Sequence, residues 1–302
     1  MTFKHFNTLK EHKGAVYALC QGEYSHQVFS AGSDRHVIAW DLTEMKAQKV
    51  IARSPTTVFS LCYIAQWNYL LIGQLEGGIH LVDLAAGKEI KYLKRHQGYV
   101  FDLLFIPEKN ELIAVSGDGS FSVWSMPEGK FLYQEKLCDG KIRSVDYNPN
   151  QKELAFALGS GEVYRCNSED FSIKERIKGF SSSVNAVCYN FATDQLFIGE
   201  KDALLSTHDL QTGQTSTPIP AHYWAIYDIA FHPNGLMATA SRDKTVKIWQ
   251  QNPLQVVKRF EGLKDKAHTH SVNKLLWTSY QDFLISTGDD RSLKIWQVSE
   301  EA

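Results

Sequence analysis

Three stretches of the sequence carry a histidine, a hydroxyl side chain and an aspartate at nearly the same spacing. The sets are His12, Ser30 and Asp34; His222, Thr239 and Asp243; and His268, Ser286 and Asp290. These are the residue types of a nucleophilic triad, in which a histidine base activates the hydroxyl and a carboxylate orients the base. A catalytic site occurs once in a chain, whereas this set recurs. The recurrence favours a structural role, and we predict no catalytic residue.

A metal site is the second chemical possibility. His268, His270 and the nearby Asp265 carry the imidazole and carboxylate groups that bind zinc. His268, however, belongs to one of the recurring sets, which leaves two free ligands on a loop. Two loop ligands are a weak signal, so we predict neither a metal site nor a cofactor.

The elements that position these residues repeat along the chain. Residues 221–250 contain three short strand-like segments separated by tight turns, at 226–231, 236–241 and 245–249. The residue near the end of the third segment recurs every 41 or 42 residues, with one interval of 47 before the last copy: Trp40, Val82, Trp124, Cys166, His208, Trp249 and Trp296. A sheet this small cannot bury its faces alone, so the seven copies must stack.

A histidine that opens the unit and a Trp-Asp pair that closes it resemble the WD40 repeat. The first copy keeps the full pair, Trp40-Asp41, whereas the sixth has Trp249-Gln250. The resemblance implies an all-β fold, a seven-bladed β-propeller of four-stranded antiparallel blades. The last repeat lacks an outer strand of its own. We therefore expect the N-terminal segment Phe3–Leu9 to complete that blade and close the ring.

The regular spacing predicts a single domain over residues 1–302. Its repeats are expected at about 12–53, 54–95, 96–137, 138–179, 180–220, 221–266 and 267–298, with residues 3–10 joining the last.

The family resemblance also implies a role for the recurring polar sets. In WD40 proteins the His, Asp and Ser or Thr form a hydrogen-bonded tetrad with the Trp, which ties the loop between blades to the sheet. We expect such tetrads around Trp40, Trp249 and Trp296. The third repeat has His96, Asp118 and Trp124, but Ala114 occupies the hydroxyl position. Its tetrad is therefore expected to be incomplete.

Composition excludes several classes of function. The net charge of −2 and the pI near 6.6 argue against a nucleic-acid partner. No run of about 18 apolar residues indicates a membrane span, and the N-terminus lacks the apolar region of a secretory signal. Five cysteines, an odd number without a C-x-x-C motif, argue against a disulfide framework and for a cytoplasmic location. Cys20, Cys62 and Cys188 share one repeat position and are expected to be small buried core residues.

The remaining candidate function is binding by a surface. In WD40 propellers the loops that carry the His and the Asp share one face, and the first residues of the inner strands line its central opening. At and near these positions we predict an aromatic arc of Tyr17, Phe59, Tyr99, Phe101 and Tyr227. A basic segment of Lys141, Arg143 and Lys201 is expected to face it.

The sixth repeat adds Tyr223 and Trp224 to this face, with Arg242 before the turn aspartate. Trp, Tyr and Arg dominate interface hot spots, so we include these residues in the predicted binding surface. The alternative is that the rings pack on neighbouring blades. Trp67, on the opposite face, is either a second contact or a loop anchor. The segment 262–266, in the longest interval, is either a contact loop or a tolerated insertion.

The sequence therefore predicts a non-enzymatic scaffold that holds a protein or peptide segment with acidic and apolar side chains. The alternative is a lactonase-like propeller hydrolase with a metal ion on the axis. Such an enzyme needs several carboxylates or histidines at the first positions of the inner strands, and the seven positions have none. Asp102 and Asp228, one residue further along, are expected to form hydrogen bonds within their own blades.

Overall fold

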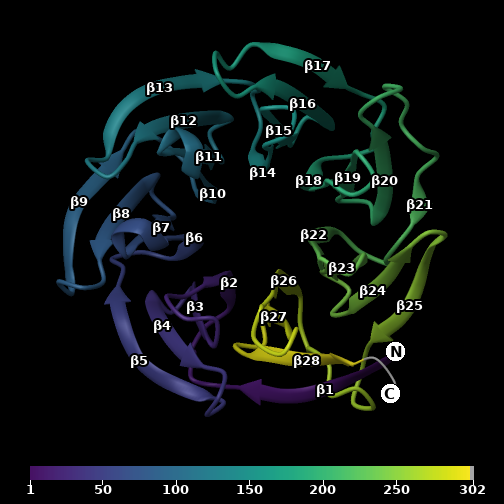
Figure 1. Ribbon diagram of the computed structural model, residues 1–302, viewed down its shortest axis with the longest axis horizontal. Coiled ribbons are helices and arrows are strands. Elements are labelled where there is room, and N and C mark those ends of the chain that lie inside the picture. Colours follow the sequence, from purple (N-terminus) through teal and green to yellow (C-terminus); the bar gives the residue numbers. More distant parts are fainter. Residues whose placement is uncertain (300–302) are drawn as a thin grey trace.

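The computed structural model describes residues 1–299 and contains seven four-stranded antiparallel sheets arranged around a central axis (Figure 1). We number the sheets as blades in chain order. Within each blade, the first strand lies next to the axis and the fourth lies at the outer edge.

Blades 1 to 4 use consecutive strands. Blade 1 comprises β2 (Val16–Gln21), β3 (Gln27–Gly32), β4 (His36–Asp41) and β5 (Lys46–Arg53). Blade 2 comprises β6 (Val58–Ile64), β7 (Tyr69–Gln74), β8 (Gly78–Asp83) and β9 (Lys88–Lys94). Blade 3 comprises β10 (Val100–Ile106), β11 (Glu111–Ser116), β12 (Ser120–Ser125) and β13 (Lys130–Lys136). Blade 4 comprises β14 (Ile142–Asn148), β15 (Glu153–Leu158), β16 (Glu162–Asn167) and β17 (Ile173–Ile177).

Blades 5 to 7 follow the same order, except that the last blade takes its outer strand from the start of the chain. Blade 5 comprises β18 (Val184–Asn190), β19 (Gln195–Glu200), β20 (Leu204–Asp209) and β21 (Ile219–Pro220). Blade 6 comprises β22 (Ile226–Phe231), β23 (Leu236–Ser241), β24 (Val246–Gln251) and β25 (Leu254–Phe260). Blade 7 comprises β26 (Val272–Trp277), β27 (Leu284–Gly288), β28 (Leu293–Ser299) and β1 (Thr2–Leu9).

The predicted fold class is therefore confirmed, including closure of the ring by the N-terminal strand. Strand β1 pairs antiparallel with β28, and Figure 1 shows these two ends of the chain side by side. Leu9 pairs with Leu293 and packs in an apolar cluster with Trp40 and Phe283. The first strand thus joins blade 7 and contacts blade 1.

The seven residues that mark the repeat spacing, from Trp40 to Trp296, occupy the same position in their blades. Each lies on the third strand of its blade, opposite a buried apolar residue of the second strand. Even where Val82, Cys166 or His208 replaces Trp, the partner is a leucine: Leu70, Leu154 and Leu196. The register is kept because β-strand side chains alternate, so a slip of one residue would turn the apolar set away from the neighbouring blade.

The core of the described chain is divided among the contacts between blades. Seven apolar clusters each combine residues of two neighbouring blades. For example, Val123 of blade 3 and Phe156 of blade 4 belong to one cluster, and Ile198 of blade 5 packs with Val163 of blade 4 in another. Each blade is stabilised by its neighbours, as in other repeat architectures.

The alternating strand directions define two faces. The connections between blades and the turns between second and third strands lie on one face, which we call the loop face. The turns between first and second strands, including two short helices at Ala65–Trp67 and Pro107–Lys109, lie on the opposite face. Within residues 1–299, the structure contains no helix with the length and apolar character needed to span a membrane.

If β1 closes the ring, Leu9→Ala should weaken the whole propeller. Leu9 is 3% exposed, so we expect the substitution to lower the free energy of unfolding by about 2–5 kcal/mol, because it removes buried methyl groups at the junction of blades 7 and 1. Chemical denaturation measures the effect. Lys4→Ala, at an exposed position of the same strand, is the control and should change stability little; an equal effect of both substitutions would contradict the closure.

Candidate functional site

The recurring histidine sets are enclosed in three blades. In blade 1, His12 Nδ1 lies 2.8 Å from Asp34 Oδ2, and His12 Nε2 lies 2.7 Å from Ser30 Oγ. Ser30 Oγ also accepts a hydrogen bond of 2.7 Å from the indole of Trp40. Blades 6 and 7 repeat the arrangement around His222 and His268, with distances of 2.7–3.0 Å. The hydroxyls and histidines are buried and bonded within the protein, so they bind loop to sheet and are not placed to attack a substrate.

Blade 3 corrects the expectation of an incomplete tetrad. Ser122, on β12, lies directly opposite Ala114 in the sheet. Its Oγ is 2.8 Å from His96 Nε2 and accepts a hydrogen bond of 2.9 Å from Trp124 Nε1. Asp118 Oδ2 lies 3.4 Å from His96 Nδ1. The hydroxyl is supplied by the neighbouring strand, because two residues paired across a sheet point to the same side.

Blade 2, which lacks the His and Trp signature, uses a network built on Gln74. Its Oε1 accepts hydrogen bonds from Ser54 and Thr56, and its Nε2 donates to Tyr92 Oη at 2.6 Å. In blade 5, Glu200 accepts hydrogen bonds from the backbone and side chain of Ser181. Each network again ties the connection between blades to the second strand.

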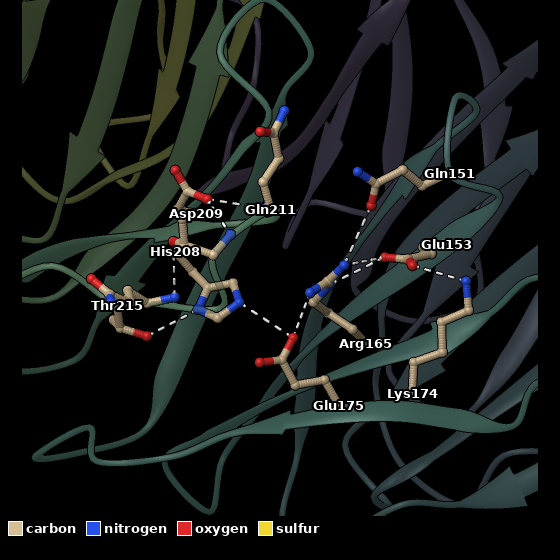
Figure 2. A network of polar contacts seen from close by, with 11 residues as sticks. Gln151, Glu153, Arg165, Lys174, Glu175, His208, Asp209, Gln211 and Thr215 are labelled. Carbon is tan, nitrogen blue, oxygen red and sulfur yellow. Dashed lines mark hydrogen bonds and ion pairs between the residues drawn. The ribbon is translucent and has the colours of Figure 1, made fainter.

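Blades 4 and 5 are further joined by a buried ionic network near the opposite face (Figure 2). Arg165 lies between Glu153 and Glu175, and its Nη2 donates to Glu153 Oε2 at 2.6 Å. Glu175 lies 3.3 Å from His208, which occupies the Trp position of blade 5. Lys174 adds a second ion pair to Glu153. Every charged group in this network has a partner of opposite charge or a hydrogen bond, so we assign it to blade packing.

The second residue of each inner strand points to the axis and lies at a β-bulge. In all seven blades the register between first and second strands shifts across one residue: Tyr17, Phe59, Phe101, Arg143, Asn185, Tyr227 and Asn273. A bulged residue is unpaired in the ladder and its side chain is re-aimed. All seven line one cavity of about 250 Å³ on the axis.

One wall of this axial cavity is aromatic. Tyr17 and Phe59 stack with ring centres 5.1 Å apart and an interplanar angle of 10°. Phe59 contacts Tyr99 at 5.1 Å and Phe101 at 5.7 Å. The predicted arc is thus continuous over blades 1 to 3. Tyr227 also lines the cavity, but Asn273 of blade 7 separates it from Tyr17 in the order of the blades.

The position of Arg143 differs from the expectation. The basic segment was expected to face the aromatic arc, but the Arg143 guanidinium lies over the Phe101 ring, 4.9 Å from its centre, and continues the arc into blade 4. Burial lowers the pKa of Arg143. Lys141 and Lys201 are exposed on the loop face and do not line the cavity.

The other wall is polar and internally paired. Lys274 Nζ lies 3.1 Å from Asp228 Oδ1, and Asp289 accepts a hydrogen bond of 2.8 Å from Asn273. Asn185 donates to the carbonyl of Ile226 at 3.2 Å. Lys274 was not among the predicted site residues. The sequence signal that could have identified Lys274 is a charged residue directly after the bulged Asn273.

The axial aspartates bridge different blades, although Asp102 also accepts the expected bond within its own blade, from the Leu103 N–H; for Asp228 the expectation of bonds within a blade is wrong. Asp102 accepts a hydrogen bond from the backbone N–H of Val145 in blade 4, and Asp228 accepts one of 2.8 Å from Leu275 in blade 7. Asp146, which was not predicted, likewise accepts a hydrogen bond of 2.7 Å from Tyr189 in blade 5. Burial raises the pKa of Asp146 to about 6. In residues 1–299 no three His, Cys, Asp or Glu side chains are grouped as metal ligands.

A second aromatic group lies on the loop face of blade 6. Tyr223 is 76% exposed and Trp224 is 57% exposed. The Arg242 guanidinium lies over Trp224 at 5.0 Å, and Arg259, which was not predicted, lies over Tyr223 at 5.1 Å. Such exposed aromatic and arginine clusters are typical of interaction sites.

Four other predicted features have clear positions. Trp67 is half-buried and contacts Phe105 of the next blade at 5.9 Å, as expected of a loop anchor. The segment 262–266 is a compact turn on the loop face in which Leu263 is 92% exposed. Asp265 pairs with Lys258, and His270 contacts Thr269.

Cys20, Cys62 and Cys188 are half-buried, not fully buried as expected, and pack against the clusters between blades.

The seven bulged inner strands, the buried tetrads and the ring closure define a WD40-type β-propeller. The model of the WD domain, G-beta repeat, matches residues 3–41, 87–125, 213–250 and 259–297, which together make up more than half of the chain. The chain therefore belongs to the WD40 repeat family.

Individual relatives match part of the chain. Nuclear distribution protein nudF 1 of Talaromyces marneffei is 25% identical over 126 residues, and human pre-mRNA-processing factor 17 is 26% identical over 128. These matches cover 41% and 39% of this chain, and only 27% and 20% of those longer proteins. The crystal structure of the WD40 β-propeller domain of Doa1 superposes with a TM-score of 0.86 at 20% identity, covering 99% of this chain and 98% of that one. The last comparison supports the fold alone.

The Ser122 tetrad gives a test of the blade 3 correction. Ser122→Ala removes the partner of His96 Nε2 and of the Trp124 indole, both buried, and should lower the free energy of unfolding by about 1–3 kcal/mol. Chemical denaturation measures this loss. Ser125→Ala, at a half-buried position on the same strand, is the control; if Ser122→Ala cost no more than this control, the cross-strand tetrad would be wrong.

The tetrad aspartates should make stability depend on pH. Burial alone would raise the pKa of Asp34, but the hydrogen bond and charge of His12, with the backbone N–H groups of Lys13 and His36, lower it to about 2. The unfolded pKa is about 3.9, so the stability from ionised Asp34 is fully present above about pH 4 and is lost as the pH falls through about 2.

Denaturation of wild type and Asp34→Asn at several pH values measures this contribution. The variant should be the less stable protein at pH 7, and the difference should shrink towards pH 2. Glu76→Gln is the control, because Glu76 occupies the same turn position of blade 2 but is exposed. A difference that does not change between pH 7 and pH 2 would argue against an ionised Asp34 in the tetrad.

Proposed function

We propose that this protein is a non-enzymatic scaffold that binds a protein or peptide segment across its loop face. Membership in the WD40 family supports a role in protein interaction. The observation that carries the proposal is the axial cavity, in which the aromatic rings of blades 1 to 3 and the Arg143 guanidinium form one continuous surface. Aromatic and arginine side chains together contribute most of the binding energy in protein interfaces.

The proposed partner segment carries apolar and acidic side chains. Apolar groups would cover the rings of Tyr17, Phe59 and Phe101, which line the axial cavity. Acidic groups would meet Arg143 and the exposed Lys141, Lys201 and Arg242. The proposal places the partner on the loop face, and Tyr223 and Trp224 extend the same surface towards the rim of blade 6.

We propose no enzymatic activity, and the contacts of the candidate catalytic and metal-binding groups support this part of the proposal. The hydroxyls of the four tetrads are buried and hydrogen-bonded, and Asp102, Asp146 and Asp228 each hold a backbone N–H of the next blade. These groups support blade packing, which leaves the lactonase-like alternative without a set of free axial ligands in the described part of the chain. We further propose a cytoplasmic location and no nucleic-acid partner, supported by the five free cysteines and the net charge of −2.

A comparative pull-down from the host lysate tests the loop face. The test variant carries Tyr99→Ser, Tyr223→Ser and Trp224→Ser, which alter exposed rings and should leave the thermal melting temperature unchanged. We expect it to lose proteins that the wild type captures, by about tenfold or more, because hot-spot truncations each weaken binding by a factor of ten or more.

The matched control carries Tyr24→Ser and Phe191→Ser, two exposed rings on turns of the opposite face. The control should capture the same proteins as wild type. If the control loses the captured proteins and the loop-face variant keeps them, the binding surface lies on the opposite face and the proposal is wrong.

A further inference from the structure

Arg143 is a charged group for which the described chain supplies neither a hydrogen-bond acceptor nor a carboxylate. Among residues 1–299, no acceptor atom takes a hydrogen bond from its guanidinium and no carboxylate pairs with it; its contact is the face of the Phe101 ring. The side chain is half-buried, and burial lowers its pKa. A guanidinium offers five N–H donors in a planar fork that matches a carboxylate.

The other charged groups of the axial cavity are already satisfied. Asp228 accepts from Lys274 and from the Leu275 N–H, and Asp289 accepts from Asn273. Asp102 accepts from two backbone N–H groups, those of Leu103 and Val145. Of the two cations that line this cavity in the described chain, Lys274 pairs with Asp228, whereas Arg143 has no carboxylate partner and can therefore pair with an anion.

The size and walls of the cavity limit what can enter. Its volume of about 250 Å³ lies below the ~300–1,000 Å³ of typical small-molecule sites, and residues of all seven inner strands surround it. A polypeptide cannot pass through the plane of such a ring of strands within this volume. What fits is one side chain or one chain end that points along the axis from the loop face.

We propose that the axial cavity receives a single carboxylate of the bound segment, which pairs with the Arg143 fork while its aliphatic part packs on Phe59 and Phe101. This inference rests on the proposed function and specifies its anchoring contact. The carboxylate has two sources, a Glu or Asp side chain or the C-terminus of the partner. Both present the same planar group to Arg143.

Four short probes distinguish the cases. They are acetyl-Leu-Glu-Leu-amide, which has a side-chain carboxylate; acetyl-Leu-Leu with a free C-terminus; acetyl-Leu-Gln-Leu-amide, a neutral isostere; and acetyl-Leu-Lys-Leu-amide, a cation. Each is titrated into the 302-residue chain while NMR follows the Arg143 Nε–Hε signal and the backbone signals of the inner strands. We expect one or both carboxylate probes to shift the Arg143 signal and to bind at least about tenfold more tightly than the Gln and Lys probes.

Substitutions then test the contact itself. Arg143→Met should weaken the carboxylate probe at least about tenfold and abolish its preference over the Gln probe, and Arg143→Lys should restore only part of the preference, because lysine lacks the fork. Lys49→Gln, at an exposed position on the outer strand β5 of blade 1, is the control and should leave the preference intact. If Arg143→Met fails to fold, the preference among the four probes on the wild-type protein decides the question alone.

Several results would overturn the inference. They are equal binding of the Glu and Gln probes, tighter binding of the Lys probe, absence of any binding to wild type, or shifts confined to residues outside the cavity. The scaffold proposal has a separate readout. If the pull-down depends on the loop face but the probes show no carboxylate preference, the scaffold proposal stands and the axial carboxylate site is wrong. If the probes bind as expected but the pull-down does not depend on the loop face, the carboxylate site stands and the scaffold proposal is wrong.

Discussion

No blade of this propeller can cover its own apolar faces, and the rest of the structure follows from that constraint. The apolar clusters of the described chain combine residues of adjacent blades, so every blade depends on two neighbours. A row of blades would leave two apolar faces open at its ends. The pairing of β1 with β28 joins those ends and removes them (Figure 1). Closure leaves only short, protected edges, as in other propellers.

Closure also determines where side chains can act. With the blade faces occupied by packing, the accessible positions are the loops, the outer strands and the bulged residues around the axis. The bulge recurs at the same place in the inner strands of all seven blades. The seven bulged residues surround the axis, and they differ in type from blade to blade. The tetrads and the networks on Gln74 and Glu200 hold the connections between blades to the sheets around this ring. The network on Arg165 joins blades 4 and 5 near the opposite face (Figure 2).

The repeat spacing predicted the blade count and the register, because the position of a residue relative to the closing Trp fixes its place in the sheet. Even the degenerate Cys166 and His208 lie where the spacing puts them. Contacts between strands were harder to predict. Ser122 supplies the hydroxyl that Ala114 lacks, which a comparison of equivalent positions does not reveal. The bonds that Asp102, Asp146 and Asp228 accept from the next blade reach about one repeat along the chain, so only the stacking of adjacent blades brings these partners together. The repeat spacing likewise placed Arg143 on the inner strand of blade 4, but it did not show that the guanidinium lies over the Phe101 ring.

The most direct test of the account is a structure of the protein bound to a partner that it captures from its host. The account predicts a segment of the partner across the loop face, over the axial opening, within contact distance of Tyr17, Phe59 and Phe101. A partner bound along the outer strands or on the opposite face, with the axial cavity and its aromatic wall uncovered, would contradict it.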